Sequence, residues 1–188
     1  TFNQDADGSD TIYGGAGNDE IHTGSWGDED QGLGNTNTGM IGDVAYGGDG
    51  NDILRGAGGN DRLSGDAGDD NIGGGGGAYI FMGGSGDDFL FSGGGDDDMA
   101  DSFYGGAGSD SIMGGAGNDA AWGGEGNDTL SGAAGADTLA GNDGDDVVSG
   151  GALADVLFGG SGDDFVNGGY GFDQVTGGAG ADHFFHAG

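Results

Sequence analysis

A nine-residue repeat runs through most of this sequence and constrains its fold more than any other feature. The repeat has the form Gly-Gly-x-Gly-x-Asp-x-U-x, in which U is an apolar residue. Seventeen nonapeptides fit it, in blocks at 5–22, 47–100 and 105–185. The sixth position is Asp in all but one nonapeptide, where Tyr79 replaces it, and the eighth position is always apolar. A period this strict predicts a solenoid in which every repeat adopts the same structure.

The composition alone would indicate disorder. Glycine accounts for 54 of the 188 residues, Pro and Cys are absent, and the formal net charge is -32. Low hydrophobicity combined with a high net charge is typical of disordered chains. Collagen is also rich in Gly, but it requires a three-residue period and much Pro. The regular nine-residue pattern is therefore the observation that favours a folded chain.

The charge and the missing cysteines exclude several classes of function. Arg55 and Arg62 are the only Lys or Arg residues, so the chain offers no basic surface to a nucleic acid. No apolar run is long enough to span a bilayer, so we expect no membrane insertion. The start of the sequence lacks the pattern of a signal peptide. The absence of Cys excludes disulfides and thiolate metal sites.

Each repeat predicts one short strand and one turn. The eighth residue and its two neighbours predict a three-residue strand, because alternate side chains of a strand point to opposite faces. The six residues before it predict a turn, in which Gly supplies positive φ and Asn or Asp at the fifth position tolerates the left-handed region. Stacked coils of 18 residues then give an all-β solenoid of two parallel sheets. The eighth-position residues are expected to fill its core: Ile12, Ile21, Leu54, Leu63, Ile72, Phe81, Leu90, Met99, Ile112, Ala121, Leu130, Leu139, Val148, Leu157, Val166, Val175 and Phe184.

Two breaks interrupt the repeat within what we expect to be a single solenoid over residues 1–188. The first repeats at 5–22 are followed by an irregular insertion at 23–46, whose last nine residues resemble a decayed repeat with Asp43 and Ala45 in the sixth and eighth positions. A short insertion at 101–104 separates the middle repeats at 47–100 from the uninterrupted repeats at 105–185. The register there is ambiguous, because Asp101 and Phe103 fit the pattern as well as Asp97 and Met99 do.

The aspartates predict a metal. Stacking places the sixth-position carboxylates of alternate repeats about one strand spacing apart, where like charges repel. The core also contains few apolar groups to offset the entropy of ordering so many residues, so we expect the metal-free chain to fold poorly. A cation held by carboxylates and turn carbonyls resolves both problems. Ca²⁺ takes six to eight oxygens in flexible geometry, whereas transition metals favour His or Cys. The expected ligands are Asp10, Asp19, Asp52, Asp61, Asp70, Asp88, Asp97, Asp110, Asp119, Asp128, Asp137, Asp146, Asp155, Asp164, Asp173 and Asp182.

The repeats resemble those of a known family. GGAGNDEIH (14–22), GGDGNDILR (47–55), GGSGDDFLF (83–91) and GGEGNDTLS (123–131) are similar to the RTX, or haemolysin-type, calcium-binding nonapeptide. The resemblance implies a right-handed parallel β-roll with several Ca²⁺ ions between the turns of alternate repeats. It also implies a secreted bacterial protein, extracellular or on the cell surface, that is exported unfolded by a type I secretion apparatus and folds outside. Tyr79 replaces a liganding Asp, so its sites should be weakened or lost, and Leu153 replaces a turn Gly, so that turn should be distorted.

The function of such a module is open among three hypotheses. The chain could stabilise an attached effector domain, form a calcium-dependent fibre, surface layer or adhesin, or serve as an accessory module of a polysaccharide-modifying enzyme. We expect no catalysis by this chain, because no nucleophile elbow, P-loop or zinc-protease motif occurs, and His22, His183 and His186 are expected to be solvated. Outward apolar residues could join copies into a homo-oligomer or be covered by residues 23–46 or by flanking domains: Ile80, Met82, Phe89, Phe91, Val156, Phe158 and Phe165.

Overall fold

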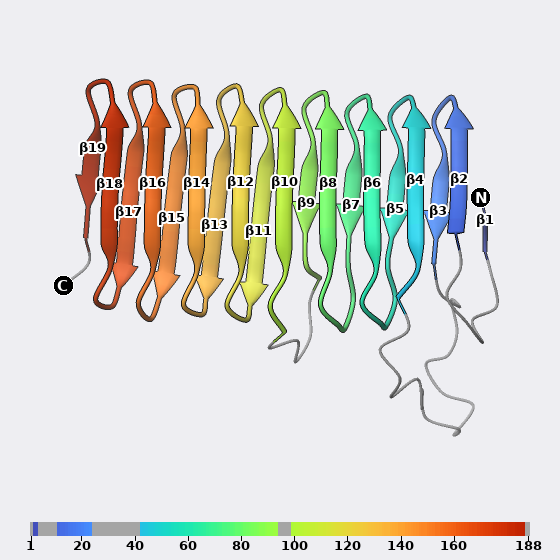
Figure 1. Cartoon of the computed structure of the whole chain (residues 1–188), viewed down its shortest axis with the longest axis horizontal. Coiled ribbons are helices and arrows are strands. Elements are labelled where there is room, and N and C mark those ends of the chain that lie inside the picture. Colours follow the sequence, from blue (N-terminus) through green and yellow to red (C-terminus); the bar gives the residue numbers. More distant parts are fainter. Residues whose placement is uncertain (1, 4–10, 24–41, 94–98, 187–188) are drawn as a thin grey trace.

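The structure is a computed structural model that describes residues 2–3, 11–23, 42–93 and 99–186. These residues form two parallel sheets that lie face to face (Figure 1). One sheet has ten strands in the order β1 (Phe2–Asn3), β3 (Glu20–His22), β5 (Ile53–Arg55), β7 (Asn71–Gly73), β9 (Phe89–Phe91), β11 (Ser111–Ala116), β13 (Thr129–Ala134), β15 (Val147–Ala152), β17 (Phe165–Tyr170) and β19 (His183–Phe185). The other has nine strands in the order β18 (Gln174–Ala179), β16 (Val156–Ser161), β14 (Thr138–Asp143), β12 (Ala120–Glu125), β10 (Ser102–Ala107), β8 (Ile80–Ser85), β6 (Arg62–Ala67), β4 (Val44–Asp49) and β2 (Thr11–Ala16).

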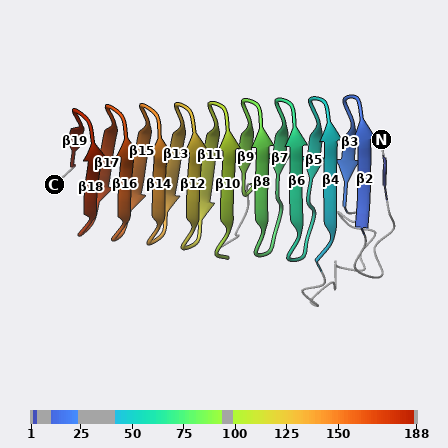
Figure 2. The same ribbon diagram turned by 45° about the horizontal axis from the view of Figure 1, so that its top comes forward.

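Consecutive strands alternate between the two sheets, and each strand pairs in parallel with the strand one coil away. Leu130 of β13, for example, lies beside Ile112 of β11 and Val148 of β15. This topology confirms the predicted all-β parallel roll. Turns from even- to odd-numbered strands form one edge, at the top of Figure 1, which we call the first edge. Turns from odd- to even-numbered strands form the second edge, and Figure 2 shows both rows of turns stacked along the roll.

Most eighth-position residues lie between the sheets, as predicted. The buried apolar core consists of Ile12, Ile21, Ala45, Leu54, Leu63, Ile72, Tyr79, Phe81, Leu90, Phe103, Ile112, Ala121, Leu130, Leu139, Val148, Leu157 and Val166. Val175 and Phe184 occupy the same position in the last coil but are 37% and 59% exposed. They were predicted to be core residues, and that prediction is wrong because no described coil packs against their outer side.

The strands are longer than the three residues predicted. All even-numbered strands, and the odd-numbered strands from β11 to β17, extend to six residues, because the ladder continues through the first three positions of the next repeat. Gly48, for example, pairs with Gly15. Only the fourth to sixth positions are left to make the turn itself, so each edge is narrow and its carboxylates lie close to the strand ends.

The register at both breaks is now resolved. The decayed repeat belongs to the roll, since Ala45 is buried and pairs with Ile12. Residues 101–104 were predicted to be an insertion, but Ser102 begins β10 and Phe103 is fully buried. Met99 was predicted to be a core residue, but it is 39% exposed. Phe103 takes that place because its ring stacks on Phe81, with ring centroids 4.7 Å apart.

The backbone at Leu153 differs from that of the neighbouring turns, in line with the sequence-based expectation. Its φ is 83°, whereas Gly at the same position has a φ of 150° at Gly135, one coil before, and 153° at Gly171, one coil after. Its N-terminal neighbour Ala152 still pairs with Tyr170 of the next coil. The difference is therefore confined to the turn, and the strands on either side keep their register.

Candidate metal sites at the two edges

The sixth-position aspartates gather in two rows, one along each edge of the roll. The first edge carries Asp19, Asp52, Asp70, Asp88, Asp110, Asp128, Asp146, Asp164 and Asp182. The second edge carries Asp43, Asp61, Asp101, Asp119, Asp137, Asp155 and Asp173, and Tyr79 stands between Asp61 and Asp101. Most of these carboxylates are buried although their turns are at the surface. Asp10 and Asp97, the two other expected ligands, lie outside the described residues.

One oxygen of each carboxylate joins successive coils. The backbone N–H of Asp52 donates to Oδ1 of Asp70 at 2.7 Å, and the N–H of Asp128 donates to Oδ1 of Asp146 at 2.8 Å. The same bond recurs along both edges at a spacing of 18 residues. The spacing becomes 22 residues where Asp88 meets Asp110 and 33 where Asp19 meets Asp52, so the ladder spans both breaks. These bonds fix each side chain with its second oxygen turned into the roll.

The second oxygen of many of these carboxylates has no donor. Among the described residues, a buried Oδ2 atom without a hydrogen-bond partner occurs at Asp19, Asp52, Asp70, Asp88, Asp110, Asp128, Asp137, Asp146, Asp155 and Asp164. A buried polar group that lacks a partner costs free energy, and a buried charge costs more. The repetition of the same feature in successive coils indicates a common partner rather than a local defect.

The first-position glycines lack a Cβ and so leave a space beside these oxygens, which we call the cradle. A Cβ added to Gly123 would collide with Oδ2 of Asp128 and would lie 2.7 Å from the carbonyl oxygen of Gly141 in the next coil. A Cβ on Gly132 would likewise meet Oδ2 of Asp137 and the carbonyl of Gly150 at 2.8 Å. A carboxylate oxygen and a main-chain oxygen thus converge at these turns. Two acceptors that share a buried space without a donor favour a cation between them.

The pKa values of these aspartates also favour a cation in the cradle. Burial raises the pKa of Asp88 and Asp128 to about 7, because the charged form loses its hydration, and repulsion from neighbouring aspartates adds to the rise. The pKa values of Asp70, Asp137, Asp146 and Asp155 rise to about 6 for the same main reason. The N–H bonds to Oδ1 offset part of this effect. Ionisation of these carboxylates therefore costs the folded roll free energy, and positive charge beside them would offset that cost.

The donor set fits a hard cation. Within the described ranges, no group of three or more His, Cys, Asp or Glu side chains could hold a metal ion by itself. Main-chain carbonyls would therefore have to complete the coordination, as the glycine cradles allow. An all-oxygen set in a flexible turn suits Ca²⁺ better than Mg²⁺, which requires near-octahedral geometry and retains its waters.

Tyr79 interrupts the row on the second edge. It is 1% exposed, and its hydroxyl donates to the carbonyl of Ala57 at 2.8 Å. Its ring fills the space beside Gly56, where a Cβ would lie 2.6 Å from Tyr79 Cε1. The aromatic side chain thus occupies the place that the oxygens share in other turns.

The fifth-position side chains form a second ladder, which sequence reasoning misread. Asn51 Oδ1 accepts the N–H of Asp69 at 3.0 Å, and Asp145 Oδ1 accepts the N–H of Asp163 at 2.8 Å. Asn51 and its counterparts were expected to adopt the left-handed region, but the described non-Gly residues with positive φ are Asp66, Ala133, Asn142 and Leu153, none of which is at the fifth position. The recurrence of Asn and Asp every 18 residues was the signal of a ladder between coils.

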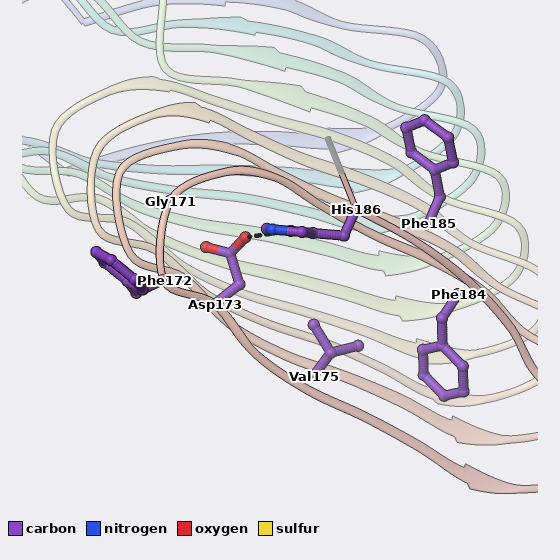
Figure 3. A pocket seen from close by; sticks show the side chains of 7 residues that line it. All are labelled: Gly171, Phe172, Asp173, Val175, Phe184, Phe185 and His186. Atoms are coloured by element: carbon purple, nitrogen blue, oxygen red, sulfur yellow. Dashed lines mark ion pairs between the residues drawn. The ribbon is translucent and has the colours of Figure 1, made fainter. Parts of the chain in front are cut away.

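A different hollow lies at the C-terminal end of the described roll. Its volume is about 590 Å³, and it is lined by Gly171, Phe172, Asp173, Val175, Phe184, Phe185 and His186 (Figure 3). His186 Nδ1 lies 3.4 Å from Asp173 Oδ2. Val175 and Phe184 are core-position residues without a following described coil, so this hollow is the open end of the core.

The three histidines differ in their surroundings. His183 and His186 are exposed, as expected. His22 was expected to be solvated, but it is buried, and its Nε2 lies 3.0 Å from Oε1 of Glu20. Glu20 holds the ring at the end of β3, next to Thr23, which is itself buried.

Comparison with known proteins identifies the repeats. A family model described as the RTX calcium-binding nonapeptide repeat (4 copies) matches residues 4–25, 46–81, 80–100, 100–121, 122–157 and 158–188. A search of curated proteins finds no match to this chain. In the described part of the chain, no helix has the length and apolar character needed to cross a membrane.

Proposed function

Because the chain belongs to the RTX calcium-binding nonapeptide repeat family, we propose that it is a module of a secreted bacterial protein that folds when it binds calcium. A roll of such repeats is a structural calcium-binding module and not a known catalytic family. The observation that carries the proposal is the recurring buried Oδ2 atom without a donor, set beside a carbonyl oxygen of the next coil.

The residues of the roll would act together with the ion. Oδ1 of each aspartate holds the preceding coil, and Oδ2 with the glycine carbonyls presents oxygen to the cradle. Bound calcium would supply the positive charge that keeps these carboxylates ionised at neutral pH. Without it, successive aspartates repel one another in a buried environment. This repulsion opposes the stability that the hydrogen bonds to Oδ1 provide.

The decisive test is folding against calcium concentration. We expect the chain in excess chelator at pH 7.5 to scatter X-rays as an expanded coil and to lack β-sheet circular dichroism. Addition of calcium to millimolar concentration should produce a compact rod with β-sheet signal, because binding to the folded state alone shifts the equilibrium towards it. Magnesium at the same concentration is the control and should be much less effective.

Two results would contradict this function. Native β-sheet signal in excess chelator at pH 7.5 would show that the roll does not require an ion. Equal folding with magnesium would show that the cradles do not select calcium.

The proposed secretion follows from the same switch. A chain that stays unfolded where calcium is scarce suits a route that exports unfolded chains, and it would stabilise an attached effector domain after export. In a cell lysate without added calcium, the chain should be digested rapidly by protease, whereas added calcium should protect it. Equal digestion under both conditions would count against this role.

A second candidate function, a structural subunit of an extracellular assembly, is favoured by the distribution of charge. Exposed acidic residues of the described turns and of the strand ends beside them all lie on the first edge, at Asp49, Asp66, Asp69, Asp87, Glu125, Asp143, Asp145 and Asp163. The seventh and ninth repeat positions in the even-numbered strands contain no Asp or Glu among the described residues, and Ile80 and Phe158 are exposed there. A face with exposed apolar groups and no acidic residue is typical of a contact surface.

Sedimentation velocity separates the two candidates. A single species of monomer mass in calcium supports the folding module, whereas mass that grows with calcium supports the subunit. The role of an accessory module in a polysaccharide-modifying enzyme stays a prediction, which binding of oligosaccharides to this chain would test.

A further inference from the structure

Three successive turns of the second edge depart together from the pattern of the roll. Thr23 replaces the usual Gly at the start of one turn, Asp61 lies in the next, and Tyr79 replaces the Asp of the third. All three side chains are buried. Thr23 Oγ1 donates to Asp61 Oδ2 at 3.2 Å, and the N–H of Asp43 donates to Asp61 Oδ1 at 2.8 Å. Both oxygens of Asp61 therefore have donors from the protein.

This satisfaction of Asp61 contrasts with the other turns. Asp52 and Asp70, in neighbouring turns of the first edge, each retain a buried Oδ2 without a hydrogen-bond partner. Beside Asp61 the first-position glycine is Gly56, and its cradle contains Tyr79 Cε1 rather than a carbonyl oxygen at close range. A hydroxyl donor and an aromatic ring thus take the two places that a cation and its carbonyl ligand would need.

The side chain of Tyr79 is anchored at its hydroxyl and at the face of its ring. Its hydroxyl donates to Ala57 O at 2.8 Å, its face stacks on Phe81 with ring centroids 5.2 Å apart, and Phe81 stacks on Phe103 at 4.7 Å. These three rings are the largest fully buried side chains among the described residues. Because the free energy of burial grows with the apolar area removed from water, these rings stabilise the roll more than small core residues such as Ala45 and Ala121 do.

The main chain of Tyr79 keeps the geometry of a liganding repeat. Its N–H donates to Asp101 Oδ1 at 2.7 Å, as the aspartates of other repeats do. Its neighbours Ile80 and Phe81 pair in the usual register with Arg62 and Leu63. Only the side chain is changed, so this turn could accept an Asp without a change of backbone.

We infer that Tyr79 and Thr23 replace a calcium ion by a protein-only connection at this point of the second edge. The inference rests on the proposed function, since it assumes that the other cradles bind calcium. It divides the second edge into a part before Tyr79, held by hydrogen bonds and aromatic packing, and a calcium-dependent part from Asp101 onward. The first edge has no such division between Asp19 and Asp182, so the two edges differ in the number of ions that they take up.

The test is a gain of calcium by substitution. Tyr79→Asp should bind about one more calcium ion per chain than the wild type in equilibrium dialysis with radioactive calcium, because it restores the carboxylate and empties the cradle beside Gly56. It should also require more calcium to fold, because the ring packing is lost. Circular dichroism in saturating calcium verifies that the variant is folded.

Two further variants test the aromatic ring of Tyr79 and the hydroxyl donor of Thr23 separately. Tyr79→Phe keeps the ring in the cradle and should leave the number of bound ions unchanged. Thr23→Val keeps the shape of the side chain but removes the donor to Asp61 Oδ2. It should raise the calcium concentration needed for folding without adding an ion, because the ring still fills the space.

The outcomes distinguish this inference from the proposed function. If the wild type binds no calcium or folds without it, the proposed function fails. If the wild type folds on calcium but Tyr79→Asp, folded in calcium, binds the same number of ions, the replacement by Tyr79 is wrong. An unchanged calcium requirement of a folded Thr23→Val would also overturn the role given to Thr23. If Tyr79→Asp does not fold, a change in the number of ions bound by Tyr79→Phe would overturn the inference, and an unchanged number would support it.

Discussion

At the scale of single residues, the two carboxylate oxygens of a sixth-position aspartate have different roles. Oδ1 accepts a hydrogen bond from the coil before, which orients the carboxylate and partly offsets its burial. Oδ2 has no donor at many of these positions and faces a main-chain oxygen of the coil after. Substitutions that change only the charge can therefore separate metal binding from the ladder.

Asp128→Asn is the substitution that tests this division. The amide oxygen can still accept the N–H of Asp110, but the negative charge beside Gly123 is lost. We expect calcium to bind on the order of tenfold more weakly at this site, since ligand charge tunes affinity. Stability without metal should rise, because one buried carboxylate no longer needs to ionise. Isothermal titration and denaturant unfolding measure the two effects.

Asp145→Asn is the matched control on the next coil of the same edge. Asp145 is exposed, and its Oδ1 accepts the N–H of Asp163, which an amide oxygen can also do. It should change neither quantity appreciably. Equal effects of both substitutions would contradict the assignment of Asp128 as a ligand and would point to overall charge instead.

The raised pKa values predict that acid can substitute in part for calcium. Burial raises the pKa of Asp88 and Asp128 from 3.8 to about 7, so between these values the folded state binds more protons than the unfolded state. The stability from these groups is fully present below 3.8 and is lost as the pH rises through about 7. In calcium-free buffer we expect more β-sheet signal at pH 5 than at pH 7.5. A roll that is less ordered at pH 5 would contradict the direction of these shifts.

At the scale of elements, sequence reasoning succeeded where the nine-residue period determines the outcome. The eighth-position core, the alternation between two sheets and the rows of aspartates follow from the period, because each repeat can only stack on its own counterpart. The register around Met99 and Phe103 did not follow, because a four-residue slip fits the pattern equally well and only the stacking of Phe103 on Phe81 decides it. His22 is the last residue before the first break, and Thr23 is the first residue within it, so no period could indicate the burial of His22 or the bond from Thr23 to Asp61.

The turn at Leu153 gives a prediction at this scale. Leu153 is 63% exposed and has a φ of 83°, a conformation that costs a non-Gly residue about 1–2 kcal/mol. Leu153→Gly should therefore stabilise the calcium-loaded roll by about 1 kcal/mol or slightly less, since Gly also loses more entropy on folding. Thermal unfolding in saturating calcium measures the change.

The reverse substitution at the corresponding turn is the control. Gly135 has a φ of 150°, and a Cβ there would collide with the carbonyl oxygen of Gly117. Gly135→Ala should lower the melting temperature. A lower melting temperature for Leu153→Gly would mean that the exposed leucine makes a stabilising contact that outweighs its strain.

At the scale of the whole molecule, each coil contacts the coils before and after it, so stability varies along the rod. Ala121 in β12 is buried between neighbours, whereas Val175 in β18 lies at the open end beside the hollow of Figure 3. We expect amide hydrogens of β18 and β19 to exchange much faster in calcium than those of β12 and β13, because terminal coils open without disturbing the rest. Uniform protection along the chain would instead indicate a single cooperative unit.

The positions of the two breaks have a practical consequence. Both breaks lie between an odd- and an even-numbered strand, one between β3 and β4 and the other between β9 and β10, while the strands on either side remain paired in register. The roll therefore tolerates extra chain length at the second edge, where the cost of closing a longer loop grows only slowly with its length. A foreign peptide grafted between Gly135 and Ala136 would be displayed at that same edge, and calcium would govern when it is presented.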